Sequence, residues 1–283
     1  CLCPMAFLQM PNWAQAPTGL KHINVQQQTI TMKPLLIYCY DAYCGWCFGF
    51  SSTIKKITDQ YKEVLDTEVL SGGMILPEKP VPIKVSADYI VKAYPIVEET
   101  TGVKFGQDFL WHIFNPDDSD WFPDSLKPAI ALCIFKAYYP ERSVEFATNL
   151  QYALNVEGRD LTDNEAYRHL LEKYGINEEA FYTKLASDEY KDLAHYEFSL
   201  IKQLQVDGYP SVFIQTKESS FHMVARGFTE EEVIYNISKC TTVNQLRNEY
   251  SSTYQWCYYH KRQDLHKDLP KAKRFNCRNN NKV

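Results

Sequence analysis

The pair Cys44 and Cys47 is the feature that most constrains how this chain can fold, because it lies between a strand-like run and a helical pattern. Leu35–Tyr40 is a short apolar and aromatic run rich in β-forming residues, which predicts a buried strand. The cysteines follow at once, and a helical pattern then continues through Tyr61. A second strand is predicted over Leu65–Leu70, closed by two glycines. The order β-α-β favours two parallel strands joined by a crossover helix.

Beyond this unit the strand signal disappears for more than a hundred residues. Helical patterns follow one another over Ser86–Glu99, Gly106–Phe114, Asp124–Tyr139, Ser143–Val156, Asp163–Tyr174 and Glu178–Leu204. Strands return at Ser211–Gln215 and His222–Arg226, and Thr229 opens a last predicted helix to Lys239. The fold class predicted is therefore α/β: a thioredoxin-like fold over residues 32–75 and 205–240, interrupted by an all-helical insertion domain over residues 76–204.

The composition is that of an ordinary globular protein. The chain has 283 residues, of which 45% are hydrophobic and 23% charged, with nine cysteines and a net charge of −5. Collagen-like, disordered and short disulfide-scaffold classes are excluded. No run approaches the roughly 18–20 apolar residues that a membrane-spanning helix needs.

Both ends of the sequence differ in charge from the middle. Residues 32–240 hold 20 Lys and Arg against 32 Asp and Glu, whereas residues 241–283 hold nine against three, and residues 1–31 hold one Lys and no acidic residue. We expect residues 1–31 to be a flanking extension outside the fold, with the working protein beginning near Met32. The basic tail over 241–283 is expected to be a solvated, disordered extension or a read-through end rather than a nucleic-acid patch.

The spacing of Cys44 and Cys47 indicates that the two thiols can form a disulfide and act as a redox pair. At the first turn of a helix, positions i and i+3 share a face, so two sulfurs there come within disulfide distance. The free N–H groups and the dipole at the helix N-terminus favour the thiolate form of Cys44, which makes it the nucleophile and Cys47 the resolving thiol. The alternatives are a zinc half-site or two core cysteines. Zinc needs a second ligand pair, and the sequence has no other Cys-x-x-Cys.

A second feature lies far downstream, at Gly208-Tyr209-Pro210-Ser211. A proline directly before a buried strand is a candidate for a cis peptide bond. Taken alone, it is equally well explained as a turn that precedes a strand. Its combination with the cysteine pair is what makes it informative.

Together these motifs resemble the DsbA family of thiol-disulfide oxidoreductases, in particular its FrnE-like branch of bacterial proteins with a large helical insertion. The resemblance covers about residues 34–240, and its most specific part is Asp41-x-x-Cys44-x-Trp46-Cys47-Phe48-Gly49-Phe50. It implies a redox centre at Cys44 and Cys47, with a cis-Pro loop beside it. It also implies that Tyr209 offers backbone hydrogen bonds to an extended substrate, so we expect Tyr209, Pro210 and Trp46 to bind substrate.

The resemblance implies exchange of disulfides with protein or small-thiol substrates. No cofactor is expected beyond the redox-active disulfide, with glutathione as a candidate co-substrate and thioredoxin or glutathione as the recycling reductant. Neither nucleic acid nor a membrane is expected as a partner, and the compartment expected is the cytoplasm. Two alternatives stay open: a glutathione-dependent isomerase or transferase on the same scaffold, and a non-enzymatic protease adaptor.

Other residues with reactive side chains are given structural interpretations. Cys39 and Cys133 are expected to pack in the core, as buried cysteines usually do. No metal site is expected, because the tail set Cys257, His260, His266 and Cys277 has irregular spacing. His112 is retained only as a distant candidate for an acid, base or pocket residue.

Overall fold

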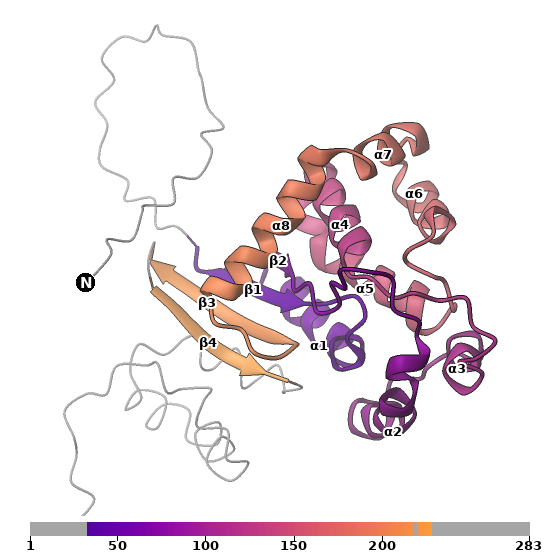
Figure 1. The fold of residues 1–283 in the computed structure, drawn as a ribbon. Helices are drawn as coiled ribbons and strands as arrows, with labels where there is room; N and C mark the ends of the chain where they lie inside the picture. Colours follow the sequence, from indigo (N-terminus) through magenta and orange to yellow (C-terminus); the bar gives the residue numbers. More distant parts are fainter. Residues whose placement is uncertain (1–32, 218–219, 228–283) are drawn as a thin grey trace, which may run out of the picture. The chain divides into compact units, whose positions relative to one another are not determined.

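The structure of the chain is a computed structural model that describes residues 33–217 and 220–227. Within these residues it forms a four-stranded sheet and a set of helices (Figure 1). The elements are β1 (Leu35–Tyr40), α1 (Gly45–Tyr61), β2 (Asp66–Ser71), α2 (Lys84–Thr101), α3 (Gln107–Phe114), α4 (Leu126–Tyr138), α5 (Ser143–Asn155), α6 (Arg168–Tyr174), α7 (Glu178–Leu185), α8 (Asp188–Gln203), β3 (Ser211–Lys217) and β4 (Ser220–Arg226). Short 3-10 turns over Pro140–Arg142 and Asn164–Ala166 precede α5 and α6.

The sheet has the order β2-β1-β3-β4. β1 pairs with β2 in parallel and with β3 in antiparallel fashion, so that Cys39 is aligned with Leu70 on one side and with Ser211 on the other. The β-α-β unit predicted from the sequence is thereby confirmed. β1 can occupy this central position because all its residues but the first are buried, as expected for a strand covered on both faces.

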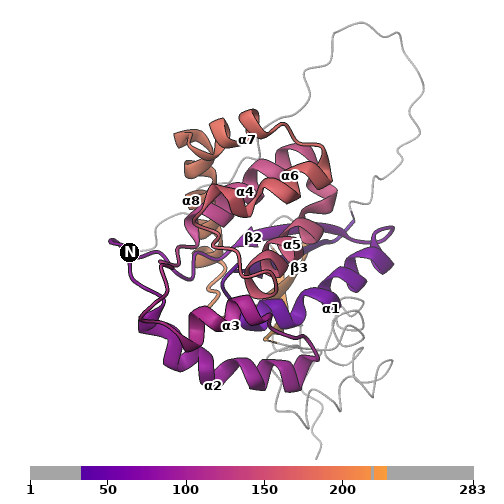
Figure 2. The same cartoon turned by 90° about the vertical axis from the view of Figure 1, so that its right-hand side faces the viewer.

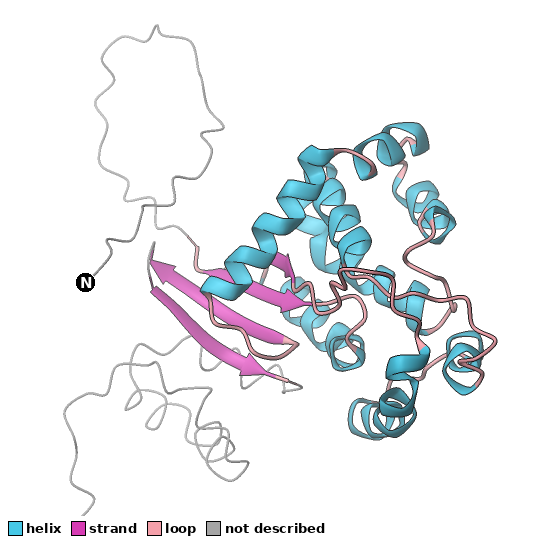
Figure 3. Cartoon of the chain, in the orientation of Figure 1, coloured by secondary structure: helices cyan, strands magenta, loops and turns pink. Residues whose placement is uncertain are grey.

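The two faces of the sheet are covered by different helices. Leu36, Tyr38 and Tyr40 belong to the buried cluster that contains α1, whereas Ile37 and Cys39 belong to a smaller cluster with Ile201 of α8. This division follows from the period of two along a strand. In the view of Figure 3 the lower end of α8 overlies the strands, and most of the other helices lie to their right.

The helical insertion and the sheet share one continuous core. The cluster that begins on β1 and α1 extends without a break into α4 and α5, where the rings of Phe135 and Phe146 stack with centroids 4.1 Å apart. Turned by 90°, the molecule shows α1 running beside α5, with α2 and α3 below (Figure 2). The predicted fold class, a thioredoxin-like α/β fold with a helical insertion, is confirmed.

Two of the predicted helices are interrupted. The pattern over Glu178–Leu204 predicted one helix, but the chain forms α7 and α8 with a break at Ala186 and Ser187. The cause is local: the Ser187 side chain accepts the N–H of Tyr190 and caps a new helix, whose first turn carries two acidic residues. The pattern over Asp163–Tyr174 is split in the same way into a 3-10 turn and α6.

Several predictions concern residues outside the described part of the chain. These are the flanking extension 1–31, the last helix, the basic tail 241–283 and the tail residues Cys257, His260, His266 and Cys277. Among the residues described, no helix is long and apolar enough to cross a membrane.

Candidate active site

Cys44 and Cys47 lie at the N-terminus of α1, as the sequence predicted. Cys44 is the N-cap residue, and its Sγ accepts a hydrogen bond of 3.2 Å from the backbone N–H of Cys47. Its carbonyl oxygen accepts the N–H of Phe48 at 3.0 Å, which closes the first turn. Cys47 is fully buried and Cys44 is 6% exposed, and both are free thiols. Of the two sulfurs, that of Cys44 is the one open to a substrate.

The peptide bond between Tyr209 and Pro210 is cis, as the sequence suggested. The loop that carries it lies directly beside the cysteines, because the Cys44 thiol donates to the carbonyl oxygen of Tyr209 at 3.6 Å. The Tyr209 hydroxyl in turn donates to the carbonyl oxygen of Gly72 at 2.9 Å. Residues 165 positions apart are thus brought into contact by the antiparallel pairing of β1 with β3.

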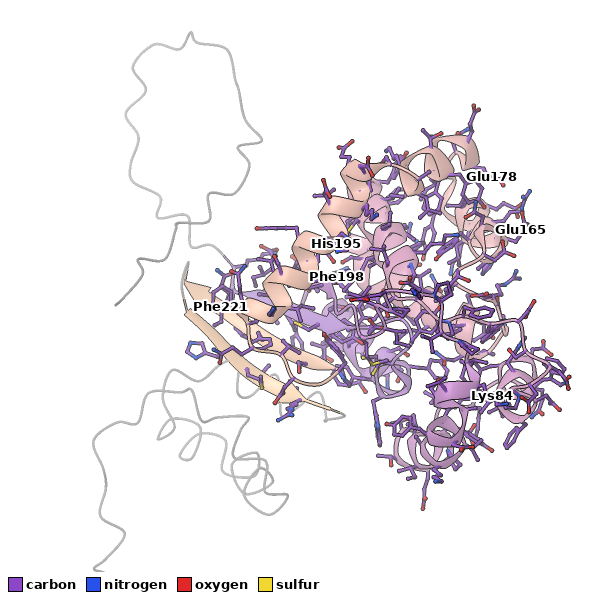
Figure 4. The ribbon with its side chains drawn as sticks, viewed as in Figure 1. Lys84, Glu165, Glu178, His195, Phe198 and Phe221 are labelled. Carbon is purple, nitrogen blue, oxygen red and sulfur yellow. The ribbon has the colours of Figure 1, made fainter. Side chains whose placement is uncertain are left out.

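Gly72 permits this arrangement because it has no side chain. A Cβ atom at this position would lie 2.3 Å from the Tyr209 ring, closer than any real contact. At the next residue, Gly73, a Cβ would meet the ring of Phe198, which projects from α8 (Figure 4). The two glycines predicted to end β2 therefore let the chain pass under the cis-Pro loop.

Asp41 is buried beneath the loop that carries the cysteines. Its carboxylate accepts the N–H of Tyr43 at 3.0 Å, the N–H of Met74 at 2.7 Å and the hydroxyl of Ser125 at 2.9 Å. Burial raises the pKa of this carboxyl above its usual value, and the hydrogen bonds oppose the rise. The carboxylate ties the chain before Cys44 to the loop that follows β2.

The insertion takes part in this network. Ser125, which precedes α4, also exchanges hydrogen bonds with Ile75: its hydroxyl accepts the N–H at 3.1 Å and its own N–H donates to the carbonyl oxygen at 2.7 Å. Gln151 of α5 donates to the carbonyl oxygen of Asp41 at 3.3 Å. The helical insertion therefore holds the cysteine loop from the side opposite the sheet.

Residues 120–229 match the family model of the DSBA-like thioredoxin domain. Over these residues the chain is similar to a DSBA-like thioredoxin domain. The matched part of this domain runs from the insertion through the cis-Pro loop to the last described strand, and it does not include Cys44 and Cys47. Comparison with curated protein sequences gives no significant match.

Similarity to solved structures extends over a larger part of the chain. The chain is similar to a candidate protein disulfide isomerase from Nitrosomonas europaea, with a TM-score of 0.62 and 21% identity over 80% of this chain and 99% of the other. It is also similar to the cytosolic disulfide reductase DsbM from Pseudomonas aeruginosa, with a TM-score of 0.57 and 19% identity over 81% and 99%. A third similar structure, a DsbA oxidoreductase candidate from Streptomyces coelicolor, has a TM-score of 0.54 and 14% identity, over 72% of this chain and 88% of the other. At these identities the likeness establishes the fold.

Two other cysteines among the described residues, and His112, are not part of the pair. Cys39 and Cys133 are buried, as predicted, and burial raises the pKa of both thiols. Cys133 donates to Glu197 at 3.3 Å. His112 stacks on Trp121 with centroids 3.9 Å apart and shares a hydrogen bond of 2.8 Å with Ser119, all within the insertion. No group of side chains able to hold a metal ion occurs among the described residues.

Trp46 lies between the two cysteines and is half-buried, with its ring packed against the main core. Met74 and Leu76, on the loop after β2, are 46% and 44% exposed. Met74 and Leu76 thus present apolar surface on the loop that begins at Gly72, the residue that Tyr209 contacts. Asp41, Gly72 and Ser125 were not predicted as site residues. Asp41 alone was quoted as part of the motif, and its position three residues before Cys44 was the only available signal.

Proposed function

We propose that this protein is a thiol-disulfide oxidoreductase of the DsbA family, FrnE-like branch, which works through Cys44-Gly45-Trp46-Cys47. One observation supports it above the others: the Cys44 sulfur caps α1, accepts the N–H of Cys47 and faces the carbonyl oxygen of Tyr209 beside the cis peptide. A sulfur at a helix N-terminus is stabilised as a thiolate by the adjacent N–H groups. A second thiol one turn away completes a centre that can alternate between dithiol and disulfide.

The reaction follows from this arrangement. The Cys44 thiolate attacks one sulfur of a substrate disulfide, and the other substrate sulfur leaves as a thiolate that takes up a proton. Cys47 then attacks Cys44 in the mixed disulfide, releases the second substrate thiol and leaves a Cys44–Cys47 disulfide. The reverse sequence oxidises a substrate dithiol. Substrates are protein or small-molecule disulfides.

Substrate binding is assigned to the cis-Pro loop and its apolar surroundings. The carbonyl oxygen of Tyr209 and the backbone around Pro210 offer hydrogen bonds to an extended segment next to Cys44. Trp46, half-buried at the edge of the pair, offers apolar contact. An enzyme that acts on many disulfides needs this combination, since backbone contacts do not depend on the substrate side chains.

We propose glutathione or thioredoxin as the reductant that recycles the pair, with no further cofactor, and the cytoplasm as its compartment. The similar DsbM is described as a cytosolic disulfide reductase and has been solved with glutathione. The same observation supports the second candidate, a glutathione-dependent isomerase or transferase. A full cysteine pair favours the redox reaction, because an isomerase or transferase needs to bind glutathione but does not need a resolving thiol.

The test is reduction of insulin disulfides by the full chain, with dithiothreitol or glutathione as the electron source. Cys44→Ser should lose essentially all activity, and Cys47→Ser should accumulate a mixed disulfide. Cys133→Ser is the matched control, because it removes a buried thiol outside the pair and should leave the rate unchanged. Undiminished reduction by Cys44→Ser would overturn the proposal.

Tight glutathione binding without a Cys44–Cys47 disulfide would favour the isomerase or transferase, and retained biological function without both cysteines would favour the protease adaptor.

A further inference from the structure

The hydroxyl of Tyr38 is a buried polar group that the reaction described above does not use. Tyr38 is 1% exposed and lies on the face of β1 that packs against α1. Within the described part of the chain, its hydroxyl oxygen has no hydrogen-bond partner. Buried hydroxyls in folded proteins almost always have a partner, so this position calls for an explanation.

Its surroundings place that hydroxyl beside the redox pair. The Tyr38 ring is held between the rings of Tyr40 and Phe50, with centroids 5.6 Å and 5.9 Å away, and Phe50 lies on α1 three residues after Cys47. Burial raises the pKa of Tyr38 well above its usual value, and the charges of Cys47 and Cys44 raise it further. The hydroxyl therefore stays protonated and available as a donor.

Cys47 is the group that needs such a donor. Its side chain is fully buried, and burial together with Cys44 raises the pKa of its thiol well above the usual value, although a hydrogen bond from the Asp41 backbone opposes the rise. Negative charge on this sulfur is therefore costly unless a donor faces it. The titratable side chains that interact with Cys47 are Cys44 at the start of α1, Asp41 in the preceding loop, Tyr38 and Tyr40 on β1 and Tyr209 in the cis-Pro loop.

Two of these groups are already committed to other contacts. Asp41 accepts hydrogen bonds from Met74, Tyr43 and Ser125, and its own charge opposes a Cys47 thiolate. The Tyr209 hydroxyl already donates to Gly72. Tyr38 combines an O–H that has no partner with a position close enough to Cys47 for the charge of that sulfur to raise the Tyr38 pKa.

We propose that the Tyr38 hydroxyl donates a hydrogen bond to Cys47 Sγ whenever that sulfur carries negative charge, and so sets the rate at which Cys47 resolves or leaves a mixed disulfide. The inference rests on the proposed thiol-disulfide exchange. In the resolving step the Cys47–Cys44 sulfur bond forms and the bond from Cys44 to the substrate sulfur breaks. The proton that Cys47 loses is balanced by the one that the departing substrate thiolate takes up. Tyr38 keeps its own proton throughout, and lowers the energy of the charged sulfur.

The experiment follows the two thiols separately. Reduced full-length protein, with the five cysteines outside the described residues changed to serine, is mixed with 5,5′-dithiobis(2-nitrobenzoate) in a stopped-flow instrument. The first release of thionitrobenzoate reports attack by Cys44, and the second reports resolution by Cys47. Tyr38→Phe should leave the first phase unchanged and slow the second by about tenfold or more, the effect of one hydrogen bond to a charged group. The pH midpoint of the second phase should also rise.

Tyr167→Phe is the matched control, because Tyr167 is equally buried and its hydroxyl donates to Leu161 at 2.6 Å, within the insertion. It should leave both phases unchanged. An unaltered second phase in a folded Tyr38→Phe protein would overturn the inference. Should that variant not fold, 3-fluorotyrosine at position 38 keeps the shape and has a more acidic hydroxyl; it should speed the second phase, and an unchanged rate would equally overturn it. Absence of any second release in the unsubstituted protein would instead refute the proposed exchange itself.

Discussion

Ser125 donates a hydrogen bond of 2.9 Å to Asp41, a residue 84 positions earlier that lies three residues before Cys44. This single contact joins the helical insertion to the cysteine loop at a carboxylate from which water is excluded. Because a buried carboxylate depends on its donors, the insertion is part of what keeps Cys44 in position. The insertion is thus more than a cover over the sheet.

Ser125→Ala should therefore destabilise the fold. It removes a donor from the buried Asp41 carboxylate and an acceptor from the N–H of Ile75, and we expect a loss of about 1–3 kcal/mol in the free energy of unfolding. Urea unfolding measures it. Ser199→Ala is the control, since Ser199 is exposed and its hydroxyl donates only to Tyr196 within its own helix. A Ser125→Ala protein as stable as the control would show that the contact contributes nothing.

The free energy of unfolding should also depend on pH through the Asp41 carboxyl. Burial raises the pKa of its carboxyl, so between the ordinary and the raised pKa the folded state binds more protons than the unfolded state. The contribution of Asp41 to stability then grows as the pH falls through this window and is lost as the pH rises. Asp41→Asn does not titrate at this position, so the stability of the unsubstituted protein relative to Asp41→Asn should increase from pH 7 downward. Urea unfolding at several pH values checks this, and a constant difference would contradict it.

A buried ion pair provides a second connection between the insertion and the sheet. Lys136 of α4 contacts Glu197 of α8, donates to Glu68 of β2 at 2.7 Å and donates to the carbonyl oxygen of Val69 at 2.9 Å. Burial lowers the pKa of Lys136, but the two carboxylates outweigh it and the net direction is upward. The other oxygen of Glu197 accepts the N–H of Ser71, at the end of β2.

Lys136→Met should cost about 3–5 kcal/mol of stability, because it leaves the buried Glu197 carboxylate without its cation. The double variant Lys136→Met, Glu197→Gln should recover part of this loss, since no buried charge then remains at the site. Lys55→Met is the matched control: its pair with Asp59 is exposed, and its removal should change stability by less than about 1 kcal/mol. Urea unfolding measures both variants. An equal loss in the free energy of unfolding for Lys136→Met and Lys55→Met would show that the buried position of the Lys136 pair makes no difference.

The sequence was informative where structure is local. The strand before Cys44, the helix after it and the turn before Ser211 each depend on a few neighbouring residues, and all were predicted at or near their observed positions. The break between α7 and α8 was missed, although Ser187 followed by two acidic residues is a local signal for a helix start. The helical periodicity on both sides of Ser187 masked it.

The contacts that hold the candidate site in place could not be predicted from the sequence, because they join segments that are far apart along the chain. Nothing in the residues around Ser125 indicates that its hydroxyl meets Asp41, and the aromatic run that predicted β1 does not single out Tyr38. Only the packing of α1 against one face of the sheet brings Tyr38 and Cys47 into the same cluster. Pairing of strands and register of packed helices are set by the whole core, which a single sequence does not display.

Gly72 offers a test of how far the cis-Pro loop controls Cys44. A Cβ at this position would overlap the Tyr209 ring, so Gly72→Ala should displace Tyr209 and, with it, the carbonyl oxygen that Cys44 faces. We expect disulfide reduction to fall about tenfold or more, the sensitivity of catalytic positioning to shifts near 1 Å. Tyr209→Phe separates the two effects, because it removes only the hydrogen bond to Gly72 and keeps the ring in place. It should retain most of the activity. Insulin reduction measures both variants, with circular dichroism to confirm folding, and a fully active Gly72→Ala protein would show that Cys44 does not depend on the placement of this loop.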